Sequence, residues 1–198
     1  MSVAVTRKSR PRDRERVEHD LTTAAADLLG ELGPRALTVR MVAERAGVNH
    51  GLIHHYFGGK QQLLYAAMRR LVGEHEEFVA RRTGGSPIPA PLALVDDPRY
   101  LRAVVRCVLD GEIDLARVEV ATGVSVPRRA LNHLAATRGQ DEPDLATKTD
   151  VALGMAIEMG WAALEPFIFT VLDVNTAEQE PMRERVRSLR RKAIGALA

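Results

Sequence analysis

The segment from Thr38 to Lys60 limits the fold of this chain more than any other, because it predicts two short helices joined by a tight turn. Its first apolar residues follow the i, i+3, i+4, i+7 spacing of one buried helical face: Val39, Val42, Ala43 and Ala46. Gly47 suits the left-handed backbone that ends a helix. Asn49 can cap the next helix by accepting a hydrogen bond from a free backbone N–H. The segment therefore predicts a helix-turn-helix.

The second of these helices is expected to present small and polar residues outward. Leu52, Ile53 and Phe57 anchor it. The outward residues are His50, Gly51, His54 and His55. A short helix with a donor-rich outer face, braced by a preceding helix, suits insertion into the major groove of DNA. The pattern thus favours a DNA-binding unit.

The chain from about residue 13 to about residue 65 resembles the DNA-binding domain of the TetR (tetracycline repressor) family of transcriptional regulators. The resemblance rests on many positions in the same order and spacing: Ala24-Ala25, Gly33, Thr38-Val39, Ala43, Ala46-Gly47-Val48, Gly51, Tyr56-Phe57, Lys60 and Leu63. The family usually has an aromatic residue, most often Tyr, where this chain has His54. The resemblance implies an all-α protein of about nine helices, with an N-terminal three-helix DNA-binding domain and a C-terminal helical domain for ligand binding and dimerisation.

The resemblance also implies candidate DNA contacts, position by position. Arg40 can reach a base edge, most strongly guanine through two parallel hydrogen bonds. Tyr56 and Lys60 match phosphate-contacting positions, and Lys60 begins a helix whose free N–H groups favour an anion. The candidate DNA-binding residues are Thr38, Arg40, Asn49, His50, Gly51, His54, His55, Tyr56 and Lys60. A solvent-exposed Arg40 without a contact, and a Gly51 that serves only helix packing, remain open alternatives.

The histidines raise the question of a metal site. His50 and His54 are four residues apart, which is also a metal-ligand spacing on a helix. No HExxH glutamate and no nearby Cys or Asp ligand set accompanies them. We therefore expect no metal site and no cofactor.

The composition favours a soluble helical protein. Its 198 residues are 45% hydrophobic, 27% charged and only 4% aromatic, which favours helices over strands. The single cysteine, Cys107, cannot form an internal disulfide, so we expect a reducing, cytoplasmic location. No apolar run reaches the roughly 18 residues of a membrane span, and the stretch from Met1 to Thr6 is too short for a secretory signal. We expect no membrane association.

Charge is unevenly distributed, although the net charge is only +2. Residues 1–72 hold 12 Lys and Arg against 7 Asp and Glu. Most of this excess comes early, where a basic arm could neutralise phosphates or enter the minor groove, and a solvated N-terminus without a dedicated contact is the alternative. We expect a basic flexible arm at residues 1–16, a helix-turn-helix DNA-binding domain at 17–72, and an effector-binding and dimerisation domain at 73–198.

Apolar periodicity and helix-ending residues place the other helices. The first is expected from about residue 13 to about residue 32, where Gly33-Pro34 ends it. The Gly- and Pro-rich residues 83–91 are expected to form a loop. The remaining helices are expected near residues 60 to 82, 98 to 109, a short one ending near 121, 127 to 137, 145 to 172, and from 181 onward.

The helix at residues 145–172 is apolar on two sides and must be covered on two sides. The core of the chain can cover one side, and a second subunit could cover the other. Pro166 should kink or break this helix near residues 162–165. The arginines of the last helix are most simply a solvated face. The resemblance implies a homodimer formed through these two C-terminal helices.

From residue 73 onward no catalytic motif occurs, so we expect no enzymatic activity. The resemblance implies a pocket for an unidentified small-molecule effector, with these plausible lining residues: Tyr100, Arg106, Met155, Glu158, Met159, Trp161 and Phe167. Ordinary core or interface packing is the alternative for each. Glu158 and Glu165 share a helix face, where they could anchor a cationic ligand, face solvent, or pair with an Arg of the last helix.

The function predicted from these features is sequence-specific regulation of transcription. The protein would be a repressor that a small-molecule effector releases from a near-palindromic site on double-stranded DNA. The alternatives are a helical ligand-binding protein and an architectural DNA-binding protein without operator-specific regulation.

Overall fold

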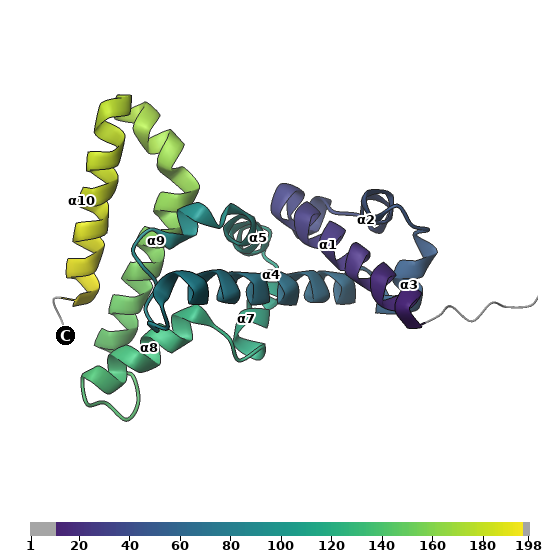
Figure 1. Ribbon diagram of the computed structural model, residues 1–198, viewed down its shortest axis with the longest axis horizontal. Helices are drawn as coiled ribbons and strands as arrows, with labels where there is room; N and C mark the ends of the chain where they lie inside the picture. The colour runs from purple at the N-terminus through teal and green to yellow at the C-terminus, as the bar shows by residue number, and fades with distance from the viewer. Residues whose placement is uncertain (1–10, 196–198) are drawn as a thin grey trace, which may run out of the picture.

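The computed structural model describes residues 11–195, and this part of the chain contains helices, turns and loops but no strand. The predicted all-α class is confirmed. The first three helices form a head at one end, and α4 runs from this head to the opposite end, where α9 and α10 lie (Figure 1). In chain order the helices are α1 (Pro11–Ala36), α2 (Val39–Ala46), α3 (Gly51–Phe57), α4 (Lys60–Thr83), η1 (Ala93–Asp96), α5 (Pro98–Leu109), α6 (Ile113–Ala116), α7 (Val118–Ala121), α8 (Val126–Thr137), α9 (Leu145–Val171) and α10 (Thr176–Gly195).

Helix α1 contains the interruption that the sequence predicts. Gly33 has φ 79° and ψ 168°, and one further turn follows it to Ala36. A Cβ at Gly33 would lie 2.8 Å from Asp110 Oδ2 on the neighbouring end of α5. Both the backbone conformation and this close approach therefore require glycine. At its other end α1 begins at Pro11, so the end of the expected arm at residues 1–16 is helical, and residues 1–10 lie outside the described residues.

The head is built around one apolar core. Helix α4 supplies the apolar side that its sequence predicts, and every residue of that side is buried: Leu63, Leu64, Ala67, Met68, Leu71 and Val72. Leu29 of α1, Val42 of α2 and Ile53 of α3 are fully buried in the same core. Farther along α4, Val79 is buried in the second half of the molecule. One continuous helix thus belongs to both halves of the protein.

The middle helices α5 and α8 begin at Pro98, as expected, and at Val126, one residue before the expected start, and each begins after a capping side chain. Asp97 precedes α5 and accepts a hydrogen bond from the Tyr100 N–H at 3.5 Å. Ser125 precedes α8 and accepts one from the Arg128 N–H at 3.4 Å. The short helix expected to end near residue 121 is present as the two single turns α6 and α7. Helix α5 packs against α1 and also against α4 and α9, so it lies between the head and the second half.

Sequence analysis expects either a kink or a break at Pro166 of α9, and the break does not occur, because α9 is continuous from Leu145 to Val171. Figure 1 shows the helix changing direction along its length, as a proline kink produces. Helix α10 begins at Thr176 rather than at Pro181. The cause is a reciprocal cap: Asn175 Oδ1 accepts from the Ala177 N–H and Glu178 Oε2 accepts from the Asn175 N–H, both at 3.0 Å.

The arginines of α10 do not form one solvated face, which corrects the sequence interpretation. Arg190 is only 6% exposed and lies against Glu158 of α9. Arg183 donates two hydrogen bonds to the carboxylate of Glu165, at 2.8 and 2.9 Å. Both α9 glutamates therefore pair with an arginine of the last helix, which is one of the alternatives that the sequence leaves open.

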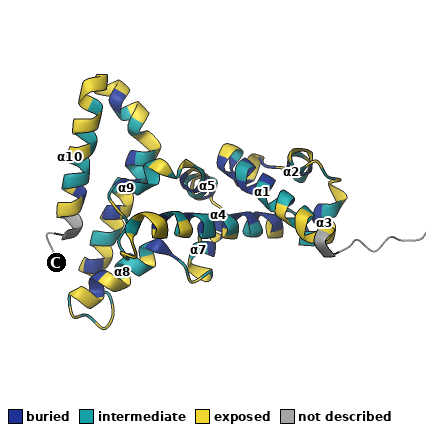
Figure 2. Ribbon diagram, viewed as in Figure 1, coloured by how far each residue is buried: buried dark blue, intermediate teal, exposed yellow. Residues whose placement is uncertain are grey.

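Helix α9 leaves apolar side chains exposed along one side. They include Leu153, Leu164, Phe167 and Val171, which are between 49% and 64% exposed. In Figure 2 buried and exposed residues alternate along this helix. By length and composition alone α9 could cross a membrane, since its 27 residues include a window of mean hydropathy 1.4 that is 17% buried. A helix that packs between two subunits has the same composition.

Candidate nucleic-acid interface and internal cavity

Helix α3 presents the residues that the sequence predicts to face outward. The exposed residues of this segment are His50, Gly51, His54 and His55. Ile53 is fully buried and holds the helix to the head. Among the described residues, no group of three or more His, Cys, Asp or Glu is arranged to hold a metal ion. The exposed imidazoles and backbone of a short, anchored helix form a surface that can enter a groove.

The turn before α3 shows why Gly51 is needed. Asn49 Oδ1 accepts a hydrogen bond from the Gly51 N–H at 2.8 Å, which is the capping bond that the sequence predicts. The residue directly before the helix is nevertheless His50, whose backbone is already helical at φ −60° and ψ −25°. A Cβ on Gly51 would lie 3.2 Å from Asn49 Oδ1 and would meet no other element. Gly51 therefore makes room for the capping side chain rather than for a packed helix.

Helix α2 is fixed at both ends. Thr38 Oγ1 accepts a hydrogen bond from the Met41 N–H at 3.3 Å, as expected for a cap. Gly47 ends the helix in the left-handed region, at φ 66° and ψ 31°. Arg45 donates two hydrogen bonds to Glu31 of α1, at 3.0 and 2.9 Å. Arg40, on the first turn, is exposed.

Lys60 and Tyr56 lie where α3 meets α4. Lys60 is the first residue of α4, whose first turn has no side-chain cap, so its free N–H groups and the Lys60 ammonium can both face an anion. Tyr56 is half-buried, and the guanidinium carbon of Arg14 lies 5.6 Å from the centre of its ring. Arg14 is a further cation beside the candidate interface. The sequence analysis places Arg14 only in the expected arm at residues 1–16. The spacing of Arg14 from Glu18, with which it pairs at 2.8 Å, is a helical signal that could have placed it on α1.

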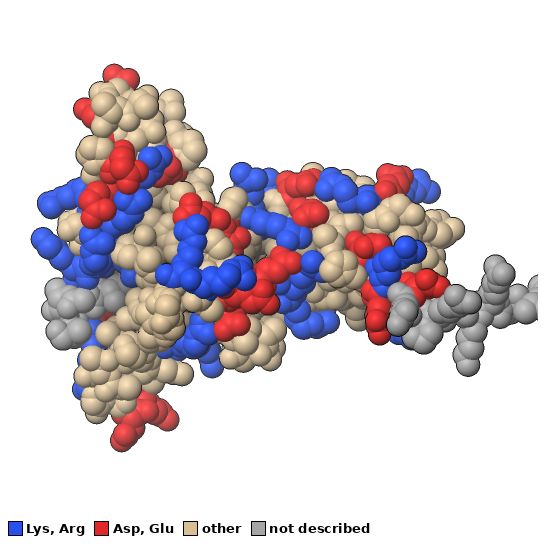
Figure 3. Space-filling model, in the orientation of Figure 1, with Lys and Arg blue, Asp and Glu red and all other residues tan. Residues whose placement is uncertain are grey.

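On the face drawn in Figure 3, surface charge alone does not mark the interface. Lys and Arg side chains are interspersed there with Asp and Glu along the whole molecule. Uncharged atoms dominate at the upper end, beside the turn between α9 and α10. The candidate interface is therefore defined by the form and exposure of α3 and its neighbours.

The second half of the molecule contains a partly open cavity of about 120 Å³. Helices α4, α5, α8, α9 and α10 all contribute to its walls, which are mainly apolar. Leu101 and Val104 of α5, Leu134 of α8 and Val151 of α9 are among the lining residues. Such a space, with few polar groups, is typical of a small-molecule site.

One set of polar residues at the cavity is centred on Glu119, which accepts hydrogen bonds from two hydroxyl groups. The Tyr100 hydroxyl donates to Glu119 Oε2, and Ser125 Oγ donates to Glu119 Oε1 at 3.0 Å. Burial, with Glu119 beside it, raises the pKa of Tyr100 well above its ordinary value. The Tyr100 ring is stacked on the His75 ring at 4.0 Å between centres, and His75 Nδ1 lies 2.8 Å from Asp97 Oδ2.

The other set of polar residues at the cavity is the ion pair of Glu158 and Arg190. Glu158 Oε1 accepts a hydrogen bond from the Leu92 N–H at 2.7 Å and lies 3.2 Å from Arg190 Nε. Burial raises the pKa of Glu158 and lowers the pKa of Arg190. In both cases the loss of water outweighs the attraction of the partner.

The structure brings four of the seven candidate ligand residues together at the cavity: Tyr100, Met155, Glu158 and Met159. The other three lie elsewhere. Arg106 reaches α1, where its Nε donates to the Gly30 carbonyl oxygen at 3.1 Å. Trp161 packs edge-on against Phe169, 6.0 Å between centres, beneath α10, and Phe167 is 64% exposed on α9. The sequence did not indicate His75, Glu119 or Arg190, because their places depend on packing between distant helices.

The segment that forms the head matches a known family model. Residues 21–67 match the model described as bacterial regulatory proteins, tetR family. These residues span most of α1, all of α2 and α3, and the start of α4. The match therefore covers the candidate interface and not the cavity.

Individual proteins extend the likeness over most of the chain. The HTH-type transcriptional repressor Rv3405c of Mycobacterium tuberculosis is 29% identical over 182 residues, which are 91% of this chain and 90% of that protein. The HTH-type transcriptional regulator BetI of Stenotrophomonas maltophilia is 37% identical over 99 residues, or 50% of this chain and 44% of that protein. The crystal structure of a putative TetR-family transcriptional regulator from Mesorhizobium loti has a TM-score of 0.63 and 16% identity, covering 93% of this chain and 96% of that one. This last likeness concerns the fold.

Proposed function

We propose that the chain is a DNA-binding transcriptional regulator of the TetR family, and that it is a homodimeric repressor released from its operator by a small molecule. The observation that carries the proposal is the arrangement of α3 and the cavity at two ends of one helical frame. Helix α3 is exposed at the end of the head, the cavity lies in the other half, and α4 is continuous between them. The similar Rv3405c protein is itself named a repressor.

DNA reading is assigned to the exposed residues around α3. Bases would be read from α3 and from Arg40, which can bond guanine through two parallel hydrogen bonds. Lys60, Tyr56 and Arg14 lie along the flank, where they would hold phosphates. Phosphate contacts set position and supply affinity, and base contacts supply sequence preference.

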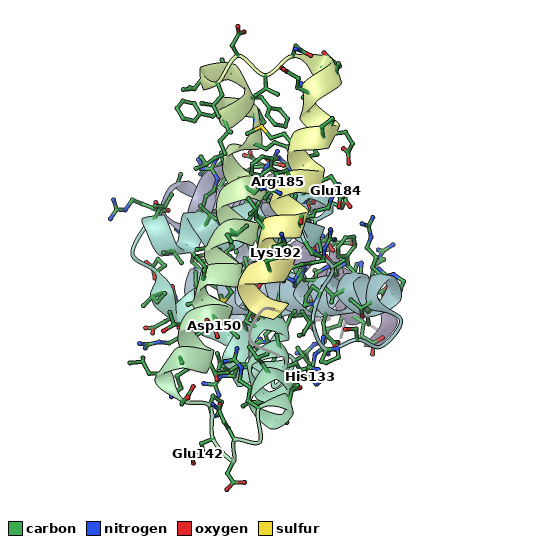
Figure 4. The ribbon with its side chains drawn as sticks, turned by 90° about the vertical axis from the view of Figure 1, so that its left-hand side faces the viewer. His133, Glu142, Asp150, Glu184, Arg185 and Lys192 are labelled. Carbon is green, nitrogen blue, oxygen red and sulfur yellow. The ribbon has the colours of Figure 1, made fainter. Side chains whose placement is uncertain are left out.

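The proposed dimer forms through α9 and α10. Figure 4 looks onto this end of the molecule, where the two helices lie side by side with no other element in front of them. The exposed apolar residues of α9 and Leu189 of α10, which is 48% exposed, would be covered by a second copy. Two heads held about 34–36 Å apart would match one turn of DNA and a near-palindromic site. Such a regulator acts on DNA in the cytoplasm, with no membrane partner.

Helix α5 is suited to link the cavity to the head. One side of it, with Tyr100, Leu101 and Val104, lines the cavity. The other side contacts α1, where Arg99 pairs with Asp27 at 2.8 Å. A ligand that favours a shifted α5 would change the position of the head and lower the population able to bind DNA.

The test is a protection footprint on the DNA flanking the gene of this protein, repeated with candidate ligands. We expect a protected near-palindrome that disappears when an effector is added. Binding of equal strength to unrelated DNA would favour an architectural DNA-binding protein instead. Absence of DNA binding would favour a helical ligand-binding protein.

A further inference from the structure

The surface of the cavity is almost entirely apolar, although several polar residues border it. Helices α5, α8 and α9 contribute apolar side chains to it, among them Leu101, Val104, Leu134, Val151 and Met159. Side chains of this kind gain from contact with an apolar molecule, because the contact removes apolar surface on both sides from water. The lining therefore favours a ligand of low polarity.

The polar residues on the α5 side of the cavity already have partners in the protein. Glu119 accepts hydrogen bonds from the hydroxyls of Tyr100 and Ser125. His75 Nδ1 lies 2.8 Å from Asp97 Oδ2. A group that is already bonded gains little from a ligand that offers it a further bond. These residues therefore give a polar ligand little to bind.

Glu158 is also held by the protein. Its Oε1 accepts a hydrogen bond from the Leu92 N–H at 2.7 Å and lies 3.2 Å from Arg190 Nε. Burial raises the pKa of this carboxyl, whereas the backbone N–H groups of Leu92, Ala93 and Leu94 and the charge of Arg190 act to lower it. Its Oε2 has almost no accessible surface, so a molecule in the cavity does not reach that atom. The pair of Glu158 and Arg190 is therefore complete without a ligand.

We propose that the cavity binds an uncharged, apolar molecule of about the size of one substituted aromatic ring. The inference rests on the proposed use of the cavity as the effector site. The cavity volume is about 120 Å³, and an apolar cavity of about 150 Å³ is large enough to take up benzene. An apolar molecule gains contacts with the lining and gives up no hydrogen bond to water. An ion of the same shape would lose its water without meeting a free counter-charge among the described residues.

The test compares four small aromatic probes: ethylbenzene, benzyl alcohol, benzylammonium and benzoate. Ethylbenzene and benzylammonium have nearly the same shape, and only the second is charged. Calorimetric titration of the full chain at neutral pH needs no variant and no DNA. We expect ethylbenzene to bind at least about tenfold more tightly than benzyl alcohol, whose hydroxyl would be buried without a partner, and both ions to bind more weakly still. Equal or tighter binding of any other probe, or no binding of ethylbenzene, would overturn the proposal.

Two matched variants place the ligand in the cavity. Ala130 of α8 lines the cavity, and Ala130→Leu adds apolar bulk there, so we expect it to weaken ethylbenzene binding by at least about tenfold. Ala136→Leu is the control, because Ala136 is exposed on the same helix and lies outside the lining. Equal losses in both variants, or no loss in Ala130→Leu, would contradict the assignment to the cavity.

Thermal unfolding establishes whether each variant is folded, and the comparison of the four probes on the unaltered chain decides the ligand class in either case. These titrations contain no DNA, so they give the same result whether or not the chain binds an operator. The proposed function and the ligand class can therefore fail separately.

Discussion

Arg106 of α5 donates a hydrogen bond from its Nε to the carbonyl oxygen of Gly30 of α1, at 3.1 Å. Near the end of the same helix, Asp110 Oδ2 accepts from the Arg35 N–H at 3.2 Å. These contacts join the head to the helix whose other side lines the cavity. The close fit requires the glycine at residue 33, since Arg106 Cβ would lie 3.3 Å from a Cβ there.

Replacing Arg106 is expected to weaken this connection while leaving both sites in place. Arg106→Ala should lower the free energy of unfolding by about 1 kcal/mol, because the Gly30 carbonyl loses its donor. It should also reduce the effect of an effector on operator affinity more than it reduces that affinity itself. Urea unfolding measures the free energy of unfolding, and fluorescence anisotropy of labelled operator measures the affinity with and without effector.

Arg117→Ala is the control. Its surface pair with Asp114 is exposed, so we expect the free energy of unfolding to change by no more than about 0.5 kcal/mol. Indistinguishable behaviour of the two variants would contradict the linking role.

Two glycines are expected to respond to alanine with opposite signs. Gly47 has φ +66°, and a Cβ added there would meet no atom within 4 Å, so Gly47→Ala should cost about 1 kcal/mol from backbone strain alone. Gly73 lies inside α4, where an added Cβ would also meet no atom within 4 Å, and Gly73→Ala should stabilise by about 0.5–1 kcal/mol. Thermal unfolding of both variants measures this. A stabilising Gly47→Ala would show that the turn between α2 and α3 relaxes out of the left-handed conformation.

The head could be predicted from the sequence because its signals are local. The cap at Thr38, the left-handed Gly47 and the interruption at Gly33 each depend on residues within one helical turn. The burial of the α4 side follows from the spacing of its apolar residues. Local chemistry and packing agree in this part of the chain, which is the condition under which sequence patterns succeed.

The second half depends on contacts between segments far apart in sequence. Glu158 meets Leu92 and Arg190 only because η1 and α10 pack on the same part of α9. No periodicity in the chain specifies which arginine of α10 turns inward, so the sequence alone predicts a solvated face for Arg190, which is buried. The start of α10 at Thr176, by contrast, could have been predicted from the sequence, since Asn175 and Glu178 have the spacing of a capping box.

Arg40 and Lys60 are expected to affect DNA binding in different ways. Arg40→Ala should cost about 1–3 kcal/mol on the operator and relax preference at one base position. Lys60→Ala should weaken all DNA sequences alike and reduce the slope of log affinity against log salt by about one unit. Anisotropy titrations over a salt series, with operator and scrambled DNA, separate the two effects. Equal losses of specificity from both changes would contradict the assigned roles.

A charge on the exposed side of α9 is expected to prevent dimer formation. Leu164 is 50% exposed, and Leu164→Arg would bury a guanidinium without a partner in the proposed interface. Sedimentation velocity should then report a monomer, with operator affinity reduced because one head alone contacts a half-site. Leu109→Arg is the control, since Leu109 is 80% exposed and belongs to α5, which is not part of the proposed interface. A Leu164→Arg protein that remains dimeric would place the interface elsewhere.

The single cysteine should report opening of the contact between α5 and the head. Cys107 is fully buried, and burial raises the pKa of its thiol from 9.0 to about 12. Only the thiolate reacts with iodoacetamide, so at pH 9 the folded protein should be alkylated far more slowly than the unfolded chain, in which half of the thiol is ionised. Because the raised pKa belongs to the folded state, its contribution to stability is complete below pH 9 and is lost as the pH rises toward 12.

Mass spectrometry of the intact chain follows the alkylation of Cys107 without ambiguity, since the sequence has one cysteine. The rate should rise in Arg106→Ala, which loosens the same helix, and stay unchanged in Arg117→Ala. Rapid alkylation of the unaltered protein at neutral pH would mean that α5 separates from the core in the native state.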